Sequence, residues 1–183
     1  MINRYVIGIV GGPGTGKDTI ARLLPEVVGE SVEVLSFSRL IIDEYCKPLG
    51  IEPTHTNLQF IGNAIRPEWI HERIYQKIEQ SNAKYFVIPS IRREGDFLFV
   101  RSFPKHLLIA VETEGRIAYE RMKQRNEKPN EDKLTWEEYL VLCNAPIDQE
   151  VPKLRKQADA TLENNGTVEE LKEKLKQIFS EVA

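Results

Sequence analysis

Several features that would assign this chain to a special class of protein are missing from it. Only two of its 183 residues are cysteines, Cys46 and Cys143, and they form no C-x-x-C pair, which predicts two free thiols rather than a disulfide framework or a metal site. No apolar run reaches the roughly 20 residues that cross a bilayer. The short apolar stretch at residues 5–10 leads into glycines rather than into a signal-peptide cleavage site, so we expect a cytoplasmic protein with no membrane partner.

A strong excess of one charge is also missing. The 25 lysines and arginines nearly balance the 28 aspartates and glutamates, and the formal net charge of −3 argues against a general affinity for nucleic acid. Hydrophobic residues make up 41% of the chain, which is ordinary for a globular protein with a buried core. The length suits one domain, so residues 1–183 are expected to fold together, with nothing in the sequence that specifies an oligomeric state.

Glycine is not abundant, but it is concentrated in one place. Residues 11–17 read Gly-Gly-Pro-Gly-Thr-Gly-Lys and fit the phosphate-binding pattern G-x-x-x-x-G-K, between an apolar segment and an amphipathic one. Glycine lets backbone amides converge on a phosphate at the start of the next helix, and the lysine reaches the outer phosphates. A turn that binds nothing is the alternative, but the lysine and the strand–turn–helix context favour a nucleoside triphosphate. The expected ligand-binding residues are Gly12, Gly14, Thr15, Gly16, Lys17, Asp18 and Thr19.

The residue after this lysine departs from the pattern. A serine or threonine usually stands there and binds Mg²⁺ through its hydroxyl, whereas this chain has Asp18, followed by Thr19. A carboxylate is electrostatically favoured at a helix N-terminus and is an oxygen ligand that Mg²⁺ accepts. Asp18 is therefore our candidate metal ligand. The alternative is that it only caps the helix.

Short β-rich apolar segments alternate with helical patterns, which predicts an α/β fold with a parallel sheet covered on both faces. Strands are expected at residues 5–10, 32–37, 85–88, 106–111 and 160–163. Helices are expected at residues 19–28, 67–80 and 115–126, after Thr135 and after Thr167. Two segments interrupt this alternation: residues 46–67, with a short helix around 57–65, and the polar residues 127–133.

Three further phrases of the sequence point to a known family. They are Ser36-Phe37-Ser38-Arg39, residues 54–66 and Glu163-Asn164-Asn165-Gly166-Thr167. With them, nearly the whole chain resembles the P-loop kinases of nucleoside monophosphates. The glycine-rich loop is similar to that of adenylate kinases, and the rest resembles the dephospho-coenzyme A kinase and deoxynucleotide kinase branch. The resemblance implies a three-layer α/β/α P-loop NTPase fold with a five-stranded parallel sheet, an acceptor-binding flap at residues 38–80 and a lid region at residues 115–145.

The same resemblance implies ATP and Mg²⁺ as cofactors and a small phosphorylated molecule as acceptor. Phosphoryl transfer depends on alignment and on dispersal of charge, so Lys17 and arginines would carry it. Arg121 and Arg125 stand four residues apart on one helix and correspond to the lid arginines of the family. The alternative for both is a solvated basic helix that pairs with its own acidic neighbours.

On the acceptor side, three arginines follow or adjoin predicted strands and the flap. Arg92 is expected to act in catalysis and, together with Arg39 and Arg66, to bind the acceptor. Each of the three could instead lie on the surface. The resemblance places Asn165 and Gly166 against the donor's base, while Asn-Gly is also simply a turn signal. For His55 and His71 we expect structural roles.

One residue conflicts with the resemblance. The branch usually has an aspartate at the end of the third strand, where this chain has Pro89, which offers neither a carboxylate nor an N–H. Either another acid supplies the missing carboxylate or catalysis is impaired. Asp18 is the first candidate for that acid, and Asp43, Glu112 and Glu114 are further candidates. The expected function is transfer from ATP to a nucleoside or deoxynucleoside monophosphate. Dephospho-coenzyme A kinase and an ATP-binding module with little transfer activity are the alternatives; no Asn-Lys-x-Asp phrase supports a GTPase.

Overall fold

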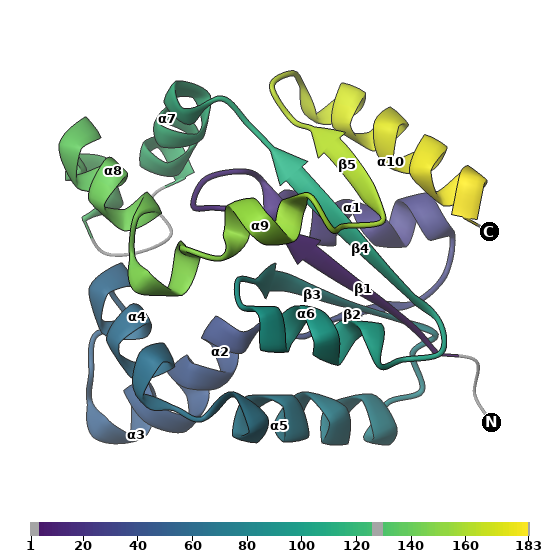
Figure 1. Cartoon of the computed structure of the whole chain (residues 1–183), viewed down its shortest axis with the longest axis horizontal. Helices are drawn as coiled ribbons and strands as arrows, with labels where there is room; N and C mark the ends of the chain where they lie inside the picture. The colour runs from purple at the N-terminus through teal and green to yellow at the C-terminus, as the bar shows by residue number, and fades with distance from the viewer. Residues whose placement is uncertain (1–3, 126–129, 183) are drawn as a thin grey trace.

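The computed structural model describes residues 4–125 and 130–182. Its centre is a five-stranded sheet in the order β2-β3-β1-β4-β5, and every strand pair in it is parallel (Figure 1). The strands are β1 (Tyr5–Val10), β2 (Val32–Val34), β3 (Tyr85–Ile91), β4 (His106–Glu112) and β5 (Ala160–Glu163). The predicted α/β class and its parallel sheet are confirmed.

Helices cover both faces of the sheet and make three layers. Because successive side chains of a strand point to opposite faces, β1 sends Val6 and Val10 to one core and Ile7 and Ile9 to the other. The second core lies against α1 (Lys17–Val28) and α10 (Val168–Val182). The first lies against α2 (Phe37–Ile41), α5 (Pro67–Gln80), α6 (Glu94–Arg101) and α9 (Val151–Arg155) (Figure 1). β1, buried on both faces, therefore reads as a continuous apolar run.

Two strands differ from their predicted bounds by more than one residue, and β4 ends one residue later than predicted, at Glu112. β2 was predicted to residue 37 but ends at Val34, because the Ser36 side chain accepts the Arg39 amide at 3.4 Å and starts α2. β3 was predicted to end at residue 88 but continues to Ile91. Proline is tolerated there because the pairing of β3 with β1 shifts register between Gly8 and Val10, and Pro89 falls in that irregularity.

The segment between β2 and β3, where a flap was predicted, consists of helices joined by short loops. After α2 come the π-helical turn Ile42–Cys46, the short α3 (Lys47–Leu49) and α4 (His55–Ala64) before α5. The helix expected around 57–65 is α4, and the one expected at 67–80 is α5. Thr54 caps α4 by accepting the Asn57 amide at 3.2 Å.

The region predicted as a lid contains α7 (Gly115–Arg125), a 3₁₀ turn at Glu131–Lys133 and α8 (Trp136–Cys143). Thr135 and Glu138 form a reciprocal capping box at the start of α8, so the predicted Thr135 cap is confirmed. A second 3₁₀ turn, Pro146–Asp148, precedes α9. Residues 126–129 of the predicted polar segment lie outside the described part of the chain. Among the described helices, none has the length and apolarity to cross a membrane.

Candidate functional site: a phosphate loop and two adjoining pockets

The glycine-rich loop joins β1 to α1, and its shape depends on glycine at two positions. Gly14 and Gly16 have φ values of 73° and 91°, which residues other than glycine rarely adopt. A Cβ on Gly14 would come within 2.2 Å of the Ala118 carbonyl oxygen of α7. Inside the loop, the Thr15 hydroxyl donates to the Gly12 carbonyl at 3.0 Å, and the buried Lys17 ammonium donates to the same carbonyl.

The turn after β5 packs behind the phosphate loop and fixes the loop through hydrogen bonds. The Asn164 amide donates to the Thr15 carbonyl at 2.9 Å, and the Thr113 hydroxyl lies 3.2 Å from the same oxygen. Asn164 is itself buried. The phosphate loop is thus held by β1, α7 and the β5–α10 turn together.

Arg121 lies beside this turn. Its guanidinium donates to the carbonyls of Asn164 and Gly166 at 2.6 and 2.7 Å. It also lines a pocket together with Gly16, Thr19 and Gly166. The Asn165 side chain accepts the Glu114 amide at 2.8 Å. Arg121, predicted as a catalytic lid arginine, therefore lies beside Asn165 and Gly166, the two residues predicted to contact the donor's base.

A second pocket of about 140 Å³ lies between the loop and the ends of β2 and β3, and we call it the transfer pocket. Its lining residues are Pro13, Gly14, Thr15, Gly16, Lys17, Asp18, Ser36, Ser38, Pro89, Ser90, Arg92 and Arg125. The sequence motif supplies half of this set, and the ends of β2, β3 and α7 supply the rest. Lys17, Asp18, Arg92 and Arg125, four of the predicted site residues, thus meet in one cavity.

Arg125 connects the lid region to the loop. It forms an ion pair with the buried Glu131 at 2.8 Å and another with Asp18 at 3.6 Å. The Asp18 side chain is 58% exposed, so this second pair adds little to stability. Asp18 points to the transfer pocket from the first turn of α1, where a carboxylate can either cap the helix or reach a metal ion.

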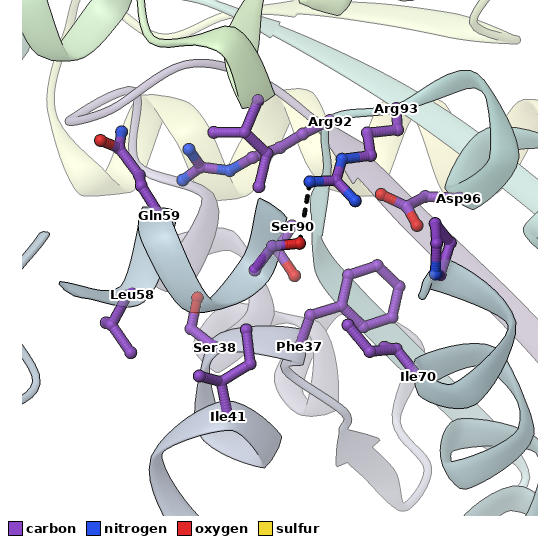
Figure 2. A pocket seen from close by; sticks show the side chains of 13 residues that line it. Phe37, Ser38, Ile41, Leu58, Gln59, Ile70, Ser90, Arg92, Arg93 and Asp96 are labelled. Carbon is purple, nitrogen blue, oxygen red and sulfur yellow. Dashed lines mark hydrogen bonds between the residues drawn. The ribbon is translucent and has the colours of Figure 1, made fainter. Parts of the chain in front are cut away.

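A third pocket lies next to the transfer pocket, between the flap and the end of β3, and we call it the acceptor pocket. Its lining residues are Phe37, Ser38, Ile41, Leu58, Gln59, Gly62, Pro67, Ile70, Ser90, Arg92, Arg93, Asp96 and Ile147 (Figure 2). Ser38, Ser90 and Arg92 line both pockets. The two cavities therefore meet at these three side chains.

Ser90 is unusual within this junction. Its hydroxyl is buried and has no hydrogen-bond partner within the described part of the chain, although nearly all buried polar atoms in proteins have one. It stands next to Pro89, the residue that replaces the expected aspartate. A group bound between the two pockets would supply the missing partner.

The structure places the predicted acceptor-binding arginines differently from one another. Arg92 lies at the junction, and its guanidinium bonds to both carboxylate oxygens of the buried Asp148 at 2.8 Å. Arg39 is 70% exposed and pairs with Asp43 at 3.4 Å. Arg66 is exposed at the N-cap of α5. Neither Arg39 nor Arg66 is among the residues that line the transfer or acceptor pocket.

Sequence reasoning missed four charged residues at the site. Arg93 and Asp96 line the acceptor pocket, and Asp148 holds Arg92. Arg155 of α9 approaches the phosphate loop: one of its terminal nitrogens lies 3.9 Å from where a Cβ on Gly12 would stand. Its Nε is buried without a hydrogen-bond partner in the described chain. Of these four residues, only Arg93 could have been suspected from the sequence, because it is a second arginine at the end of the third predicted strand.

Tyr139 of α8 packs the lid region against the phosphate loop. Its hydroxyl donates to the Pro13 carbonyl at 3.3 Å. Burial, followed by its hydrogen bond with Cys143, raises the pKa of Tyr139 well above the usual value, so the phenol stays protonated as a donor. Burial likewise raises the pKa of the Cys143 thiol, despite the opposing effects of the Tyr139 hydrogen bond and the nearby Lys17.

These residues fit a bound nucleoside triphosphate with its magnesium ion. Glycine at positions 14 and 16 lets the Ala118 carbonyl and the Asn164 side chain approach the loop closely, and the loop residues, Lys17 and Arg125 line the transfer pocket. The described residues contain no cluster of three or more His, Cys, Asp or Glu for a metal. Mg²⁺ does not need such a cluster, since the ion usually takes one or two carboxylates and completes its shell with phosphates and water. Asp18 is the side chain placed to contribute.

The fold and this site define a nucleotide-binding protein of the P-loop kinase-like class. The sequence profile of the AAA domain family matches residues 7–140, which include the phosphate loop and most of the sheet, and the chain belongs to this family. Relatives described as UPF0200 proteins match nearly end to end. The protein of Methanothermobacter thermautotrophicus is 23% identical over 187 residues, covering 100% of this chain and 93% of its own length. That of Aeropyrum pernix is also 23% identical, over 92% of this chain and 89% of its own.

Solved structures show the same fold at low sequence identity. TT1252 from Thermus thermophilus superposes with a TM-score of 0.61 at 20% identity, over 99% of both chains. Shikimate kinase from Bacteroides thetaiotaomicron gives a TM-score of 0.70 at 13% identity, over 96% of this chain and 98% of its own. Shikimate kinase from Acinetobacter baumannii, solved in complex with shikimate, gives 0.58 at 17% identity, over 98% and 95%. At such identities the likeness concerns the fold.

Proposed function

We propose that the protein is an ATP-dependent phosphotransferase that moves the γ-phosphoryl group from ATP and Mg²⁺ to a nucleotide-like acceptor, most simply a nucleoside or deoxynucleoside monophosphate. The observation that carries the proposal is the junction of the two pockets. Ser38, Ser90 and Arg92 line both the pocket at the phosphate loop and a second pocket beside it. A protein that only bound ATP would not require the second pocket at that position.

The roles of the residues follow from their positions. The loop amides and Lys17 would bind the outer phosphates of the donor, and Arg121 would lie against the nucleoside end of the site. Arg125 and Arg92 would flank the group in transit and disperse its charge. The Ser90 hydroxyl would donate to the acceptor phosphate. Bound Mg²⁺ would neutralise charge on the donor phosphates, with Asp18 oriented toward it.

A phosphate acceptor needs no strong general base, because its oxygen is already ionised. This fits Pro89, which leaves the end of β3 without a carboxylate. Transfer to the hydroxyl of dephospho-coenzyme A would benefit from a base that removes the proton. We therefore favour the monophosphate acceptor over the dephospho-coenzyme A alternative.

The second candidate, an ATP-binding module with little transfer activity, is favoured by one contact. Arg92, the arginine best placed to meet an acceptor phosphate, is partly neutralised by Asp148 in the present arrangement. If the pair persists when ligands bind, Arg92 contributes less positive charge to transfer.

An acceptor panel separates the candidates. Purified protein is incubated with ATP and Mg²⁺ and with each nucleoside monophosphate, dephospho-coenzyme A or shikimate, and ADP release is measured. Acceptor-dependent release with a monophosphate supports the proposal, and Lys17→Ala should reduce it by about a hundredfold or more. Lys84→Ala is the matched control, because Lys84 is an exposed lysine paired with Glu30 at the start of β3, remote from both pockets. ATP binding without acceptor-dependent ADP release would favour the binding module.

A further inference from the structure

The floor of the acceptor pocket carries a buried carboxylate. Asp96 is only 7% exposed and lies in the first turn of α6. Its Oδ1 lies 2.8 Å from Nε2 of His71 on α5. The imidazole is itself fixed, because it stacks on the Phe99 ring at 4.6 Å with only 2° between the planes. A carboxylate accepts up to about four hydrogen bonds, so Asp96 retains the capacity for a ligand.

Arg93 supplies donors to the same pocket. One of its terminal nitrogens donates to the Gly62 carbonyl at 2.9 Å and to the Asn63 side chain at 2.8 Å, which fixes the guanidinium against α4. A guanidinium has five N–H groups, so others are available to a ligand. Figure 2 shows the Arg93 and Asp96 side chains both directed into the pocket. The pocket therefore offers a fixed acceptor and a fixed donor together.

The remaining wall is largely apolar. It is formed by Phe37, Ile41, Leu58, Ile70 and Ile147. Such a wall favours a flat heterocycle, which buries apolar area while presenting polar atoms only at its edge. A hydroxylated carboxylic acid could also use Asp96 and Arg93, but its polar faces would be buried against these side chains without partners.

We propose that this pocket binds an acceptor nucleotide through a base that carries an exocyclic amino group beside a ring hydrogen-bond acceptor, namely cytosine or adenine. Asp96 accepts from the amino group, and Arg93 donates to the adjacent ring nitrogen. Carboxylates make this contact with the cytosine amine in nucleic-acid recognition. The ring N–H of uracil instead lies between two carbonyl oxygens. A carboxylate that accepted from this N–H would be repelled by both oxygens.

The position of the pocket agrees with this orientation. A base near Asp96 and Arg93 places the phosphate of the same nucleotide toward Ser38, Ser90 and Arg92, where the transfer pocket begins. The inference rests on the proposed function only in taking the acceptor to be a nucleotide. It assigns the base-reading residues, His71 being the positioning residue that holds Asp96.

The test compares ligands that differ in one group. Binding of cytidine against uridine monophosphate, and of adenosine against inosine monophosphate, is measured by calorimetry with the donor site saturated by a non-transferable ATP analogue. We expect at least one amino-bearing ligand to bind about tenfold tighter than its partner. Asp96→Asn should reduce that ratio to below about threefold, since an amide can present either a donor or an acceptor. Glu30→Gln, the same chemical change in an exposed ion pair with Lys84, should leave it unchanged.

Equal affinities within both ligand pairs, or an unchanged ratio in Asp96→Asn, would overturn the inference. Tighter binding of a hydroxylated carboxylic acid than of any nucleotide would do so as well. If Asp96→Asn does not fold, the wild-type comparison with the 4-deamino analogue of cytidine monophosphate decides: it should bind as weakly as uridine monophosphate. Transfer is scored separately by ADP release. Amino-dependent binding without transfer would refute the proposed function alone, and equal transfer to the two members of both ligand pairs would refute only this inference.

Discussion

Arg92 and the buried Asp148 form an ion pair that joins the end of β3 to the turn before α9. One terminal nitrogen of Arg92 lies 2.8 Å from each carboxylate oxygen of Asp148, whose side chain is 2% exposed. The two residues are far apart in sequence, and the pair places the guanidinium where both pockets open. It therefore couples the segment after the lid region to the proposed point of transfer.

Breaking this pair should cost stability. Asp148→Asn leaves the largely buried Arg92 guanidinium without its counter-charge, and we expect the free energy of unfolding in urea to fall by about 3 kcal/mol. Lys153→Ala, which removes an exposed pair with Glu94, should cost less than about 1 kcal/mol. An equal loss in the two variants would contradict a structural role for the Arg92–Asp148 pair.

The phosphate loop should tolerate no side chain at Gly14. Gly14→Ala places a Cβ 2.2 Å from the Ala118 carbonyl oxygen and also strains a φ of 73°, so we expect ATP binding to be lost. Gly29→Ala is the matched control, because Gly29 has a φ of 66° with nothing within 4 Å of the added Cβ. It should cost about 1 kcal/mol and leave nucleotide affinity intact. Calorimetric titration measures the ATP affinity of each variant, and thermal unfolding measures its stability. Comparison of the two variants separates the effect of the positive φ from that of the clash with Ala118.

Asp18 should affect the magnesium requirement rather than stability. In Asp18→Asn we expect the Mg²⁺ concentration for half-maximal turnover to rise severalfold, because one anionic oxygen ligand is lost. The melting temperature should stay nearly unchanged, since the pair with Arg125 is exposed. Glu26→Gln, a carboxylate-to-amide change on the same helix, is the control. Unchanged Mg²⁺ dependence would return Asp18 to a capping role.

Ser90 should separate stability from activity. Its hydroxyl has no hydrogen-bond partner in the described chain, so Ser90→Ala removes an uncompensated polar atom and should leave the unfolding free energy equal or higher. Turnover should nevertheless fall about tenfold if the hydroxyl donates to the acceptor phosphate. Ser102→Ala, which removes an exposed hydroxyl bonded to the Phe99 carbonyl, is the control. Full turnover in Ser90→Ala would remove Ser90 from the site.

Cys143 should react slowly with alkylating reagents. Burial raises the pKa of its thiol, so the reactive thiolate is scarcer at neutral pH than in an ordinary cysteine. In a Cys46→Ser background, we expect iodoacetamide to modify the folded protein more slowly than the urea-unfolded protein at pH 8. The difference should narrow as the pH rises toward the raised pKa. Faster reaction of the folded protein would contradict it.

Much of the fold was predictable because its signals are local. The five strands alternate with helical patterns, and all five strand starts and the Thr135 cap were predicted from residues close by in the sequence. The misplaced ends have local competitors: the Ser36 cap ends β2 early, and the register shift opposite Pro89 lets β3 continue. Helix α6 was not predicted, because it is only eight residues long and its N-cap residue provides no side-chain cap.

The phosphate loop is what the sequence by itself determined about this protein. Its glycines, lysine and flanking strand and helix are contiguous, and the left-handed turns that shape the loop depend on which residues are present rather than on distant neighbours. The acceptor side was decided only by tertiary structure. Asp96 meets His71, and Arg92 meets Asp148, across separate elements, and burial decides which arginines line the pockets. No spacing in the chain encodes those meetings, because they arise from packing around the carboxyl ends of the strands.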